Sequence, residues 1–261
     1  MIVNSKLKDE KYFWVRVPRT GTMSYTKLFG GKDYDPVNKI SHNHQKYINT
    51  DCYLNCSEEV SSKYKSYPAF SLVRHPVSRM VSILNKMTQI AYRTQDEWDQ
   101  RPGSDYIFCS YCEQKIRRTE TLRPKEASET YKRFISDEDF FYKTLYEIFN
   151  KNCQYKNIQY KNIHDDLAED LIRSGKGSGG FFALFRTQTE MAYHPKVKIF
   201  KYENISEFNN WIENTLGYDV SKLETRNKSE TFTSINTNTN RFKELVEYLF
   251  HDDFKLFGYT I

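Results

Sequence analysis

The segment from Tyr12 to Phe29 limits what this chain can fold into, because it joins a strand pattern to a helix pattern through a very short turn. Its first six residues, Tyr-Phe-Trp-Val-Arg-Val, are mostly β-branched or aromatic and predict a buried strand. Pro18 and Gly21 then break the strand, and the residues after them favour a helix with hydroxyl groups near its start. A strand-turn-helix unit of this kind indicates an α/β domain.

Such a turn is also an anion-binding site in outline. The first turn of a helix has unpaired backbone N–H groups and the positive end of the helix dipole. Side-chain donors are available from Arg19, Thr20, Thr22 and Ser24. We therefore expect a phosphorylated ligand here, and an ordinary strand-to-helix connection with a glycine for the bend is the alternative.

A second unit of the same kind follows at residues 67–84. Its strand pattern, Ala69 to Val73, is apolar, and Pro76 suits the first turn of a helix whose apolar residues recur at steps of three and four. Arg74 stands at the carboxyl end of that strand, where open α/β sheets bind ligands, and Ser82 lies in the second turn of the helix. Both side chains are predicted to converge on one phosphate, unless Arg74 makes a solvated ion pair instead.

The rest of the chain is expected to add helices and a third strand to one domain over residues 1–261. Residues 92–135 break the regular pattern with basic and aromatic side chains, and they predict an insertion or lid. The other expected ranges are 136–149, 164–173, 205–216 and 239–250 for helices, and 197–202 for a strand.

Composition limits the class of function. The chain has 261 residues and a formal charge of +5, which suits an anionic ligand but is too mild for a typical nucleic-acid binder. No apolar run reaches the roughly 20 residues of a membrane span, and no signal-peptide pattern is found, so a cytoplasmic protein is expected. The five cysteines are expected to be free thiols rather than a zinc site made by Cys52, Cys56, Cys109 and Cys112, and no metal is expected.

Two short motifs are weaker indicators of function. Residues 175–180 fit the pattern G-x-G-x-x-G, but a predicted helix precedes them where a dinucleotide site needs a strand, so a flexible loop is expected. His42 and His44 are an unusual pair in a chain with six histidines. They are either part of a polar surface turn or functional, and a metal site would need a third ligand.

Three blocks, in order, carry a resemblance to a known family. Residues 17–24, 73–82 and 253–259 are similar to the 5'-phosphosulfate loop, the 3'-phosphate motif and the C-terminal ending of sulfotransferases that use 3'-phosphoadenosine-5'-phosphosulfate (PAPS). In particular, the chain resembles the carbohydrate type, which includes heparan sulfate 2-O- and 6-O-sulfotransferases and bacterial relatives. The resemblance implies a P-loop NTPase-like three-layer sandwich, with a central, mainly parallel sheet flanked by helices.

The resemblance also implies a role for each matching residue. Arg19 stands where the family has a lysine that neutralises charge on the transferring group, and arginine keeps that charge but is a poorer proton donor. One of His42 and His44 would be the general base, and His42 is preferred because the apolar Ile48 follows six positions later. The residues expected to hold the cofactor are Pro18, Arg19, Thr20, Gly21, Thr22, Met23, Ser24, Arg74, Ser82, Lys228 and Ser229.

The implied reaction is transfer of a sulfuryl group from PAPS to a hydroxyl of a carbohydrate or glycan-like acceptor, without metal. A protein tyrosine, a lipid or a small metabolite is an alternative acceptor, and the sequence does not indicate the oligomeric state. One alternative function is a P-loop nucleotide kinase, although the turn has a single glycine and no lysine ahead of its hydroxyls. The other is a non-catalytic protein that binds polyanions.

Overall fold

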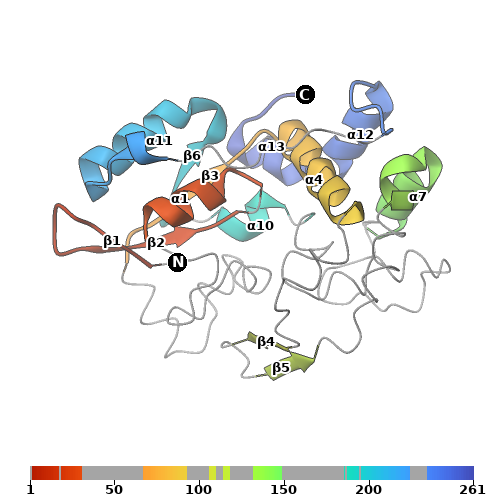
Figure 1. Cartoon of the computed structure of the whole chain (residues 1–261). Coiled ribbons are helices and arrows are strands. Elements are labelled where there is room, and N and C mark those ends of the chain that lie inside the picture. Colours follow the sequence, from red (N-terminus) through yellow and green to blue (C-terminus); the bar gives the residue numbers. More distant parts are fainter. Residues whose placement is uncertain are drawn as a thin grey trace.

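The computed structural model of the chain describes residues 2–17, 19–30, 67–92, 132–148, 185, 187–193, 195–223 and 234–261, together with the backbone of residues 106–109 and 114–117. Its largest sheet has four strands in the order β1-β2-β3-β6 (Figure 1). These strands are β1 (Ile2–Asn4), β2 (Lys11–Val15), β3 (Ala69–Val73) and β6 (Val197–Lys201).

Three of the four strands run parallel. β2 pairs in parallel with β3, and β3 with β6, so that Phe13 lies opposite Ala69 and Ala69 opposite Val197. The short β1 pairs antiparallel with β2 and was not expected from the sequence. The predicted mixed α/β fold with a mainly parallel sheet flanked by helices is therefore confirmed for the described residues.

Helices cover both faces of this sheet because successive side chains of a strand point to opposite sides. On one face, Trp14, Phe70 and Phe200 pack against α1 (Thr22–Leu28) and α11 (Ile205–Trp211), which continues as a π-helical turn to Leu216. On the other face, residues such as Phe13 and Val73 pack against α10 (Gln188–Ala192) and α13 (His251–Phe257). Large rings dominate the first face, as the aromatic content of the sequence suggests.

Besides the clusters on the two faces, another apolar cluster lies beside the sheet, between α4 (Pro76–Ala91), α7 (Glu138–Ile148) and α12 (Asn240–Leu249) (Figure 1). Phe140, Phe141 and Leu145 of α7 are buried in it, as the helical spacing of their sequence predicts. Side chains cap two of these helices, since Asp137 accepts from the N–H of Phe140, and Thr239 from the N–H of Phe242.

The remaining predictions have mixed outcomes. The strand expected at 197–202 and the helices expected at 205–216 and 239–250 are confirmed, whereas α10 and α13 were not expected. The expected insertion contains an antiparallel pair, β4 (Tyr106–Cys109) and β5 (Gln114–Arg117), and otherwise lies largely outside the described residues. The expected helix at 164–173 and the glycine-rich residues 175–180 lie outside them too. No helix in the described ranges is long and apolar enough to cross a membrane.

Candidate functional site

The carboxyl ends of β2, β3 and β6 meet at one edge of the sheet because the three strands are parallel. Three connections start from this edge: the turn before α1, the turn between β3 and α4, and a 3₁₀ turn at Tyr202–Asn204 after β6 (Figure 1). The described candidate residues of the two predicted anion sites lie in the first two connections or in the helices that follow them. The topology thus places both predicted sites on the same side of the domain.

The turn before α1 has an unusual backbone. Arg19 has φ +70° and Gly21 has φ +78°, and Arg19 is the one non-glycine residue with positive φ in the described part of the chain. A bulky residue rarely adopts this conformation, and strain of this kind is concentrated at functional sites. Gly21 is also needed for space, because a Cβ atom added there would lie 3.0 Å from the ring of Tyr202.

The Arg19 guanidinium joins the two predicted anion sites. Its Nε and Nη2 atoms donate to the Oγ atom of Ser82, at 3.2 and 3.0 Å. Ser82 belongs to α4, in the second strand-turn-helix unit, and is partly exposed. The forked guanidinium therefore connects the loop expected to bind the phosphosulfate, to which Arg19 belongs, with Ser82, which is expected to bind the 3'-phosphate.

Positive charge accumulates at this edge. Burial lowers the pKa of Arg19 to about 10, and the nearby cations Arg74 and Arg79 contribute further. No carboxylate of the described residues forms an ion pair with Arg19 or Arg74. The Arg74 guanidinium lies over the Tyr202 ring, 4.9 Å from its centroid, and its buried Nε has no acceptor among the described residues. An anion at this edge would satisfy donors that the described chain leaves unused.

Arg79 has a different environment. It is fully buried, lies 5.3 Å from the centroid of the Phe250 ring, and is attracted electrostatically to Asp253 of α13. Burial raises the pKa of Asp253, and Arg79 and the backbone N–H groups of Gln188 and Thr189 oppose that rise. Arg79 therefore balances a buried carboxylate, while Arg19 and Arg74 are partly exposed.

Comparison with known proteins decides the family. A model of the sulfotransferase family matches residues 7–260, almost the whole chain. The chain belongs to the sulfotransferase family. No curated protein and no solved structure matches the chain. The family predicted from the blocks at residues 17–24 and 73–82 is thus confirmed, and the protein is a sulfotransferase enzyme.

Several other predicted site residues of this sulfotransferase lie in the turn before α1 or in the first residues of α1. The hydroxyl of Thr20 is buried and donates to the carbonyl of Val17 at 2.9 Å, so in this structure it stabilises the turn. Thr22 is buried as well, and Ser24 is partly exposed. Met23 lies within α1, and its side chain is outside the described part. The residues wholly outside the described part are Pro18, His42, His44, Lys228 and Ser229.

Two residues that sequence reasoning missed hold the end of β3. The Gln188 side chain accepts from the backbone N–H of Arg74 at 2.8 Å and donates to its carbonyl at 2.7 Å. Asp253 accepts from the N–H groups of Gln188 and Thr189 at 2.9 and 2.7 Å. The amino-acid sequence indicated these two residues only weakly. Asp253 belongs to the C-terminal block of the resemblance, but no motif or spacing marked Gln188 in α10.

The C-terminal segment of the sulfotransferase is attached to the same edge. Glu203 accepts from the His75 backbone N–H at 2.8 Å and from the Tyr259 hydroxyl at 2.9 Å. The His75 ring Nδ1 lies 3.3 Å from the N–H of Val77 and its Nε2 lies 2.8 Å from the Thr260 carbonyl, an arrangement that suits a proton on Nε2. Burial and the carboxylate of Glu203 both raise the pKa of Tyr259.

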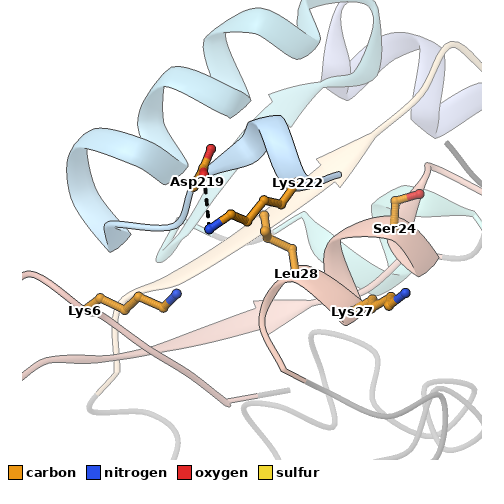
Figure 2. Close-up of a pocket in the computed structure, with 6 residues that line it drawn as sticks. All are labelled: Lys6, Ser24, Lys27, Leu28, Asp219 and Lys222. Carbon is orange, nitrogen blue, oxygen red and sulfur yellow. Dashed lines mark ion pairs between the residues drawn. The ribbon is translucent and has the colours of Figure 1, made fainter. Parts of the chain in front are cut away.

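A pocket of about 230 Å³ opens on the flank of α1 and includes Ser24, the last residue of the loop expected to bind the phosphosulfate (Figure 2). Three lysines give it a net positive lining, although the Lys222 ammonium is 3.4 Å from the carboxylate of Asp219. Its lining residues are Lys6, Ser24, Lys27, Leu28, Asp219 and Lys222. Among the described residues, no three His, Cys, Asp or Glu side chains gather in a way that could hold a metal ion.

Proposed function

We propose that this sulfotransferase uses PAPS as its donor and transfers the sulfuryl group to a hydroxyl of a carbohydrate or glycan-like acceptor. The observation that carries the proposal is the convergence of Arg19, Arg74 and Ser82 at the carboxyl edge of the sheet. PAPS has two anionic ends, a 5'-phosphosulfate and a 3'-phosphate. A site with two adjacent cations and no carboxylate paired with them in the described chain suits such a ligand.

The residues at the edge fit the donor. The buried Nε of Arg74 has no acceptor in the described chain, and a phosphate oxygen would provide one. Ser82 accepts both bonds from Arg19, so its own hydrogen is available for a phosphate oxygen. In this proposal residues 18–24 surround the phosphosulfate, Arg74 and Ser82 bind the 3'-phosphate, and Lys228 and Ser229 close over the nucleotide.

The reaction is a direct displacement at sulfur. The acceptor hydroxyl oxygen forms a bond to sulfur while the bond from sulfur to the 5'-phosphate oxygen breaks, and the hydroxyl proton passes to a histidine. His42 is the preferred base and His44 the alternative. Arg19 stabilises the charge that develops on the sulfuryl oxygens and on the departing phosphate. Since the guanidinium stays charged near neutral pH, its role is electrostatic rather than proton donation.

The proposal includes the finer architecture implied by the family. The described sheet and the helices on its two faces support a three-layer sandwich of the P-loop NTPase type. Residues 1–261 would form one domain, with the insertion at about 92–135 near the acceptor. An acceptor that is a glycan rather than a protein tyrosine or a lipid is proposed on the resemblance alone. A cytoplasmic location is proposed because no apolar run of the sequence reaches the length of a membrane span.

Calorimetric titration with adenosine 3',5'-bisphosphate, the product of the donor, tests the cofactor. We expect micromolar binding that weakens strongly without the 3'-phosphate, and that falls at least tenfold in Arg74→Ala, because charge-assisted hydrogen bonds are lost. Lys243→Ala, which removes an exposed cation of α12, is the control for net charge.

Preference for ATP over the bisphosphate would support a nucleotide kinase. Loss of binding in Lys222→Ala but not in Arg74→Ala would place the nucleotide in the lysine pocket instead.

Turnover tests the catalytic histidine once an acceptor has been found by screening glycans with labelled PAPS. A general base contributes about 100- to 10,000-fold, so the correct histidine variant should lose that much turnover and keep its affinity for the bisphosphate. His42→Ala is expected to show this loss, with His44→Ala as the matched variant two positions away. Bisphosphate binding without transfer in the wild type, on any acceptor, would favour a binding protein over an enzyme of this chemistry.

A further inference from the structure

The side chain of Gln188 pairs with the backbone of Arg74 through two hydrogen bonds, where β3 ends. The N–H of Arg74 donates to Oε1 at 2.8 Å, and Nε2 donates to the Arg74 carbonyl at 2.7 Å. One side chain thus satisfies both backbone groups of the residue that follows the last strand position. The two backbone groups also fix which end of the amide is oxygen, because the opposite assignment would face donor with donor.

Gln188 has little freedom to move. Its side chain is fully buried, so breaking either hydrogen bond would leave a polar group without water. Its own N–H donates to Asp253 at 2.9 Å, and the N–H of Thr189 donates to the other carboxylate oxygen at 2.7 Å. Asp253 is fully buried too, and it belongs to α13. The end of β3 is therefore attached to two helices that follow it by more than a hundred residues in the chain.

The guanidinium of Arg74 has few contacts of its own among the described residues. Beyond its backbone, the contacts of Arg74 in the described chain are the Tyr202 face at 4.9 Å and electrostatic repulsion from Arg19. Repulsion between the two cations favours side-chain conformations of Arg74 that point away from Arg19. The two bonds from Gln188 fix the position and direction of the Cα–Cβ bond from which the Arg74 side chain extends. Catalytic and binding groups need this kind of support to stay within a fraction of an ångström of their working position.

We propose that Gln188 is a positioning residue that directs Arg74 toward the 3'-phosphate of the nucleotide, and that Asp253 holds Gln188 in place for that task. The inference rests on the proposed function, since it assigns the specificity of the same site. Gln188 would not contact the nucleotide itself, but it would contribute to the protein's preference for nucleotides that have a 3'-phosphate. The link is mechanical, through the backbone of Arg74.

The test is the ratio of two affinities, for adenosine 3',5'-bisphosphate and for adenosine 5'-monophosphate, which isolates the contribution of the 3'-phosphate. Gln188→Met keeps the volume of the side chain and removes both hydrogen bonds. We expect it to lower the ratio on the order of tenfold, as coupled neighbouring residues do. In the Arg74→Ala background the same substitution should leave the ratio unchanged, because the group that Gln188 positions is then absent.

If Gln188 only supported the fold, other substitutions in α10 would change the ratio of affinities in the same way. Met191→Ala is the matched control, because Met191 is buried in the same short helix, packs against the sheet and makes no polar contact with Arg74. It should lower thermal stability and leave the ratio of affinities at the wild-type value. If Met191→Ala lowers the ratio as much as Gln188→Met does, the positioning role is wrong and α10 acts only by supporting the fold.

Gln188→Glu gives a second reading that also serves if Gln188→Met does not fold. A protonated glutamic acid keeps an acceptor for the Arg74 N–H and donates its O–H to the carbonyl, whereas the carboxylate cannot donate. Burial favours the protonated form, so the affinity ratio relative to wild type should rise as the pH is lowered. A ratio that equals the wild-type value at a pH where the variant's loss of stability shows that its carboxylate has formed would overturn the proposal.

Failure of this inference is distinguishable from failure of the proposed function. If wild-type protein shows no preference for the 3'-phosphate, the donor assignment is wrong and the positioning role is wrong with it. If wild type and Met191→Ala share a clear preference that Gln188→Met and Gln188→Glu also keep, only the positioning role is wrong. Both readouts are binding measurements and do not depend on knowing the acceptor.

Discussion

Arg19 and Ser82, which are 63 positions apart, are joined by two hydrogen bonds from the guanidinium Nε and Nη2 to one hydroxyl oxygen, at 3.2 and 3.0 Å. Arg19 belongs to the loop expected to bind the phosphosulfate, and Ser82 to the helix expected to bind the 3'-phosphate. The two ends of the donor would thus be sensed by side chains in direct contact. Loss of the group at one end of the nucleotide should therefore change how tightly the protein binds the other end.

Ser82→Ala removes the acceptor shared by both donors of Arg19. Since the guanidinium is largely buried and repelled by Arg74, losing that acceptor should cost about 1 to 3 kcal/mol of unfolding free energy. Affinity for adenosine 3',5'-bisphosphate should fall as well. Urea unfolding and calorimetric titration measure the two effects. Ser206→Ala, an exposed serine of α11, is the control and should change neither value.

Arg19→Lys tests the effect of arginine at a position where the resemblance implies a lysine. The environment that lowers the pKa of Arg19 to about 10 would act on a lysine too, whose ordinary pKa is about two units below that of arginine. The same burial and neighbouring cations should therefore lower the pKa of the lysine below its usual range, and losing a cation weakens anion binding. Bisphosphate affinity of the variant should begin to decline at a lower pH than that of wild type.

The control for this pH series is Arg241→Lys, an exposed cation of α12, which should follow the wild-type curve. Parallel pH curves for Arg19→Lys and wild type would show that the position 19 cation is not desolvated. The proposed electrostatic reason for arginine would then be incorrect. Weaker binding by Arg19→Lys at every pH is expected in addition, because a lysine cannot reproduce the two-pronged contact with one oxygen.

Gly21→Ala and Gly30→Ala form a matched pair. Both glycines have positive φ, +78° and +73°, so alanine is strained at each by about 1 kcal/mol. At Gly21 the new methyl group meets the Tyr202 ring at 3.0 Å, whereas none of the described residues lies within 4 Å of the corresponding position at Gly30. Gly21→Ala should therefore lose more stability in urea unfolding and should weaken bisphosphate binding, unlike Gly30→Ala.

A second substitution identifies the cause of the difference. Tyr202→Ala removes the ring that the methyl group would meet, so it should recover part of the additional loss in the Gly21→Ala background. Equal losses in the two glycine variants would mean that the Tyr202 ring moves aside without resistance.

Sequence patterns predicted the parts of this fold that depend on interactions between residues close together in the chain. β3 has the expected bounds, α4 begins at Pro76, and Gly217 ends the helical segment after β6. Each depends on neighbours within a few positions, through strand propensity, the fixed φ of proline or the left-handed conformation of glycine. The candidate residues Arg19, Arg74 and Ser82 followed from the ends of these elements.

Sequence patterns of this kind could not predict contacts between segments that are far apart in the chain. Gln188 meets Arg74 across 114 positions and Asp253 across 65, and no periodicity links them. Arg79 stands three positions before Ser82 in α4, and nothing near it in the sequence indicates that it is fully buried with Asp253 balancing its charge. Thr20 was expected to offer its hydroxyl to a ligand, but that hydroxyl donates to Val17 within the turn. Tertiary contacts decide which polar groups face inward.

Asp253→Asn tests the buried carboxylate that connects α13 with α10. The amide keeps one acceptor but turns an NH₂ group toward the other backbone N–H, and it removes the charge that balances Arg79. Breaking a buried charge network in this way costs about 3 to 5 kcal/mol, against less than about 1 kcal/mol for Asp252→Asn, its exposed neighbour. Similar losses for both variants in urea unfolding would contradict a special role for Asp253.

The pH dependence of stability gives the same carboxylate a second, independent readout. Its pKa is raised in the folded state, so between the ordinary value of 3.8 and the raised value the folded protein holds more protons than the unfolded chain. This group therefore makes the free energy of unfolding fall as the pH rises through that range. Asp253→Asn does not titrate and should lack this contribution, whereas Asp252→Asn should keep it. A wild-type curve that matches Asp253→Asn in slope over this range would mean that Arg79 and the two N–H groups fully offset the burial.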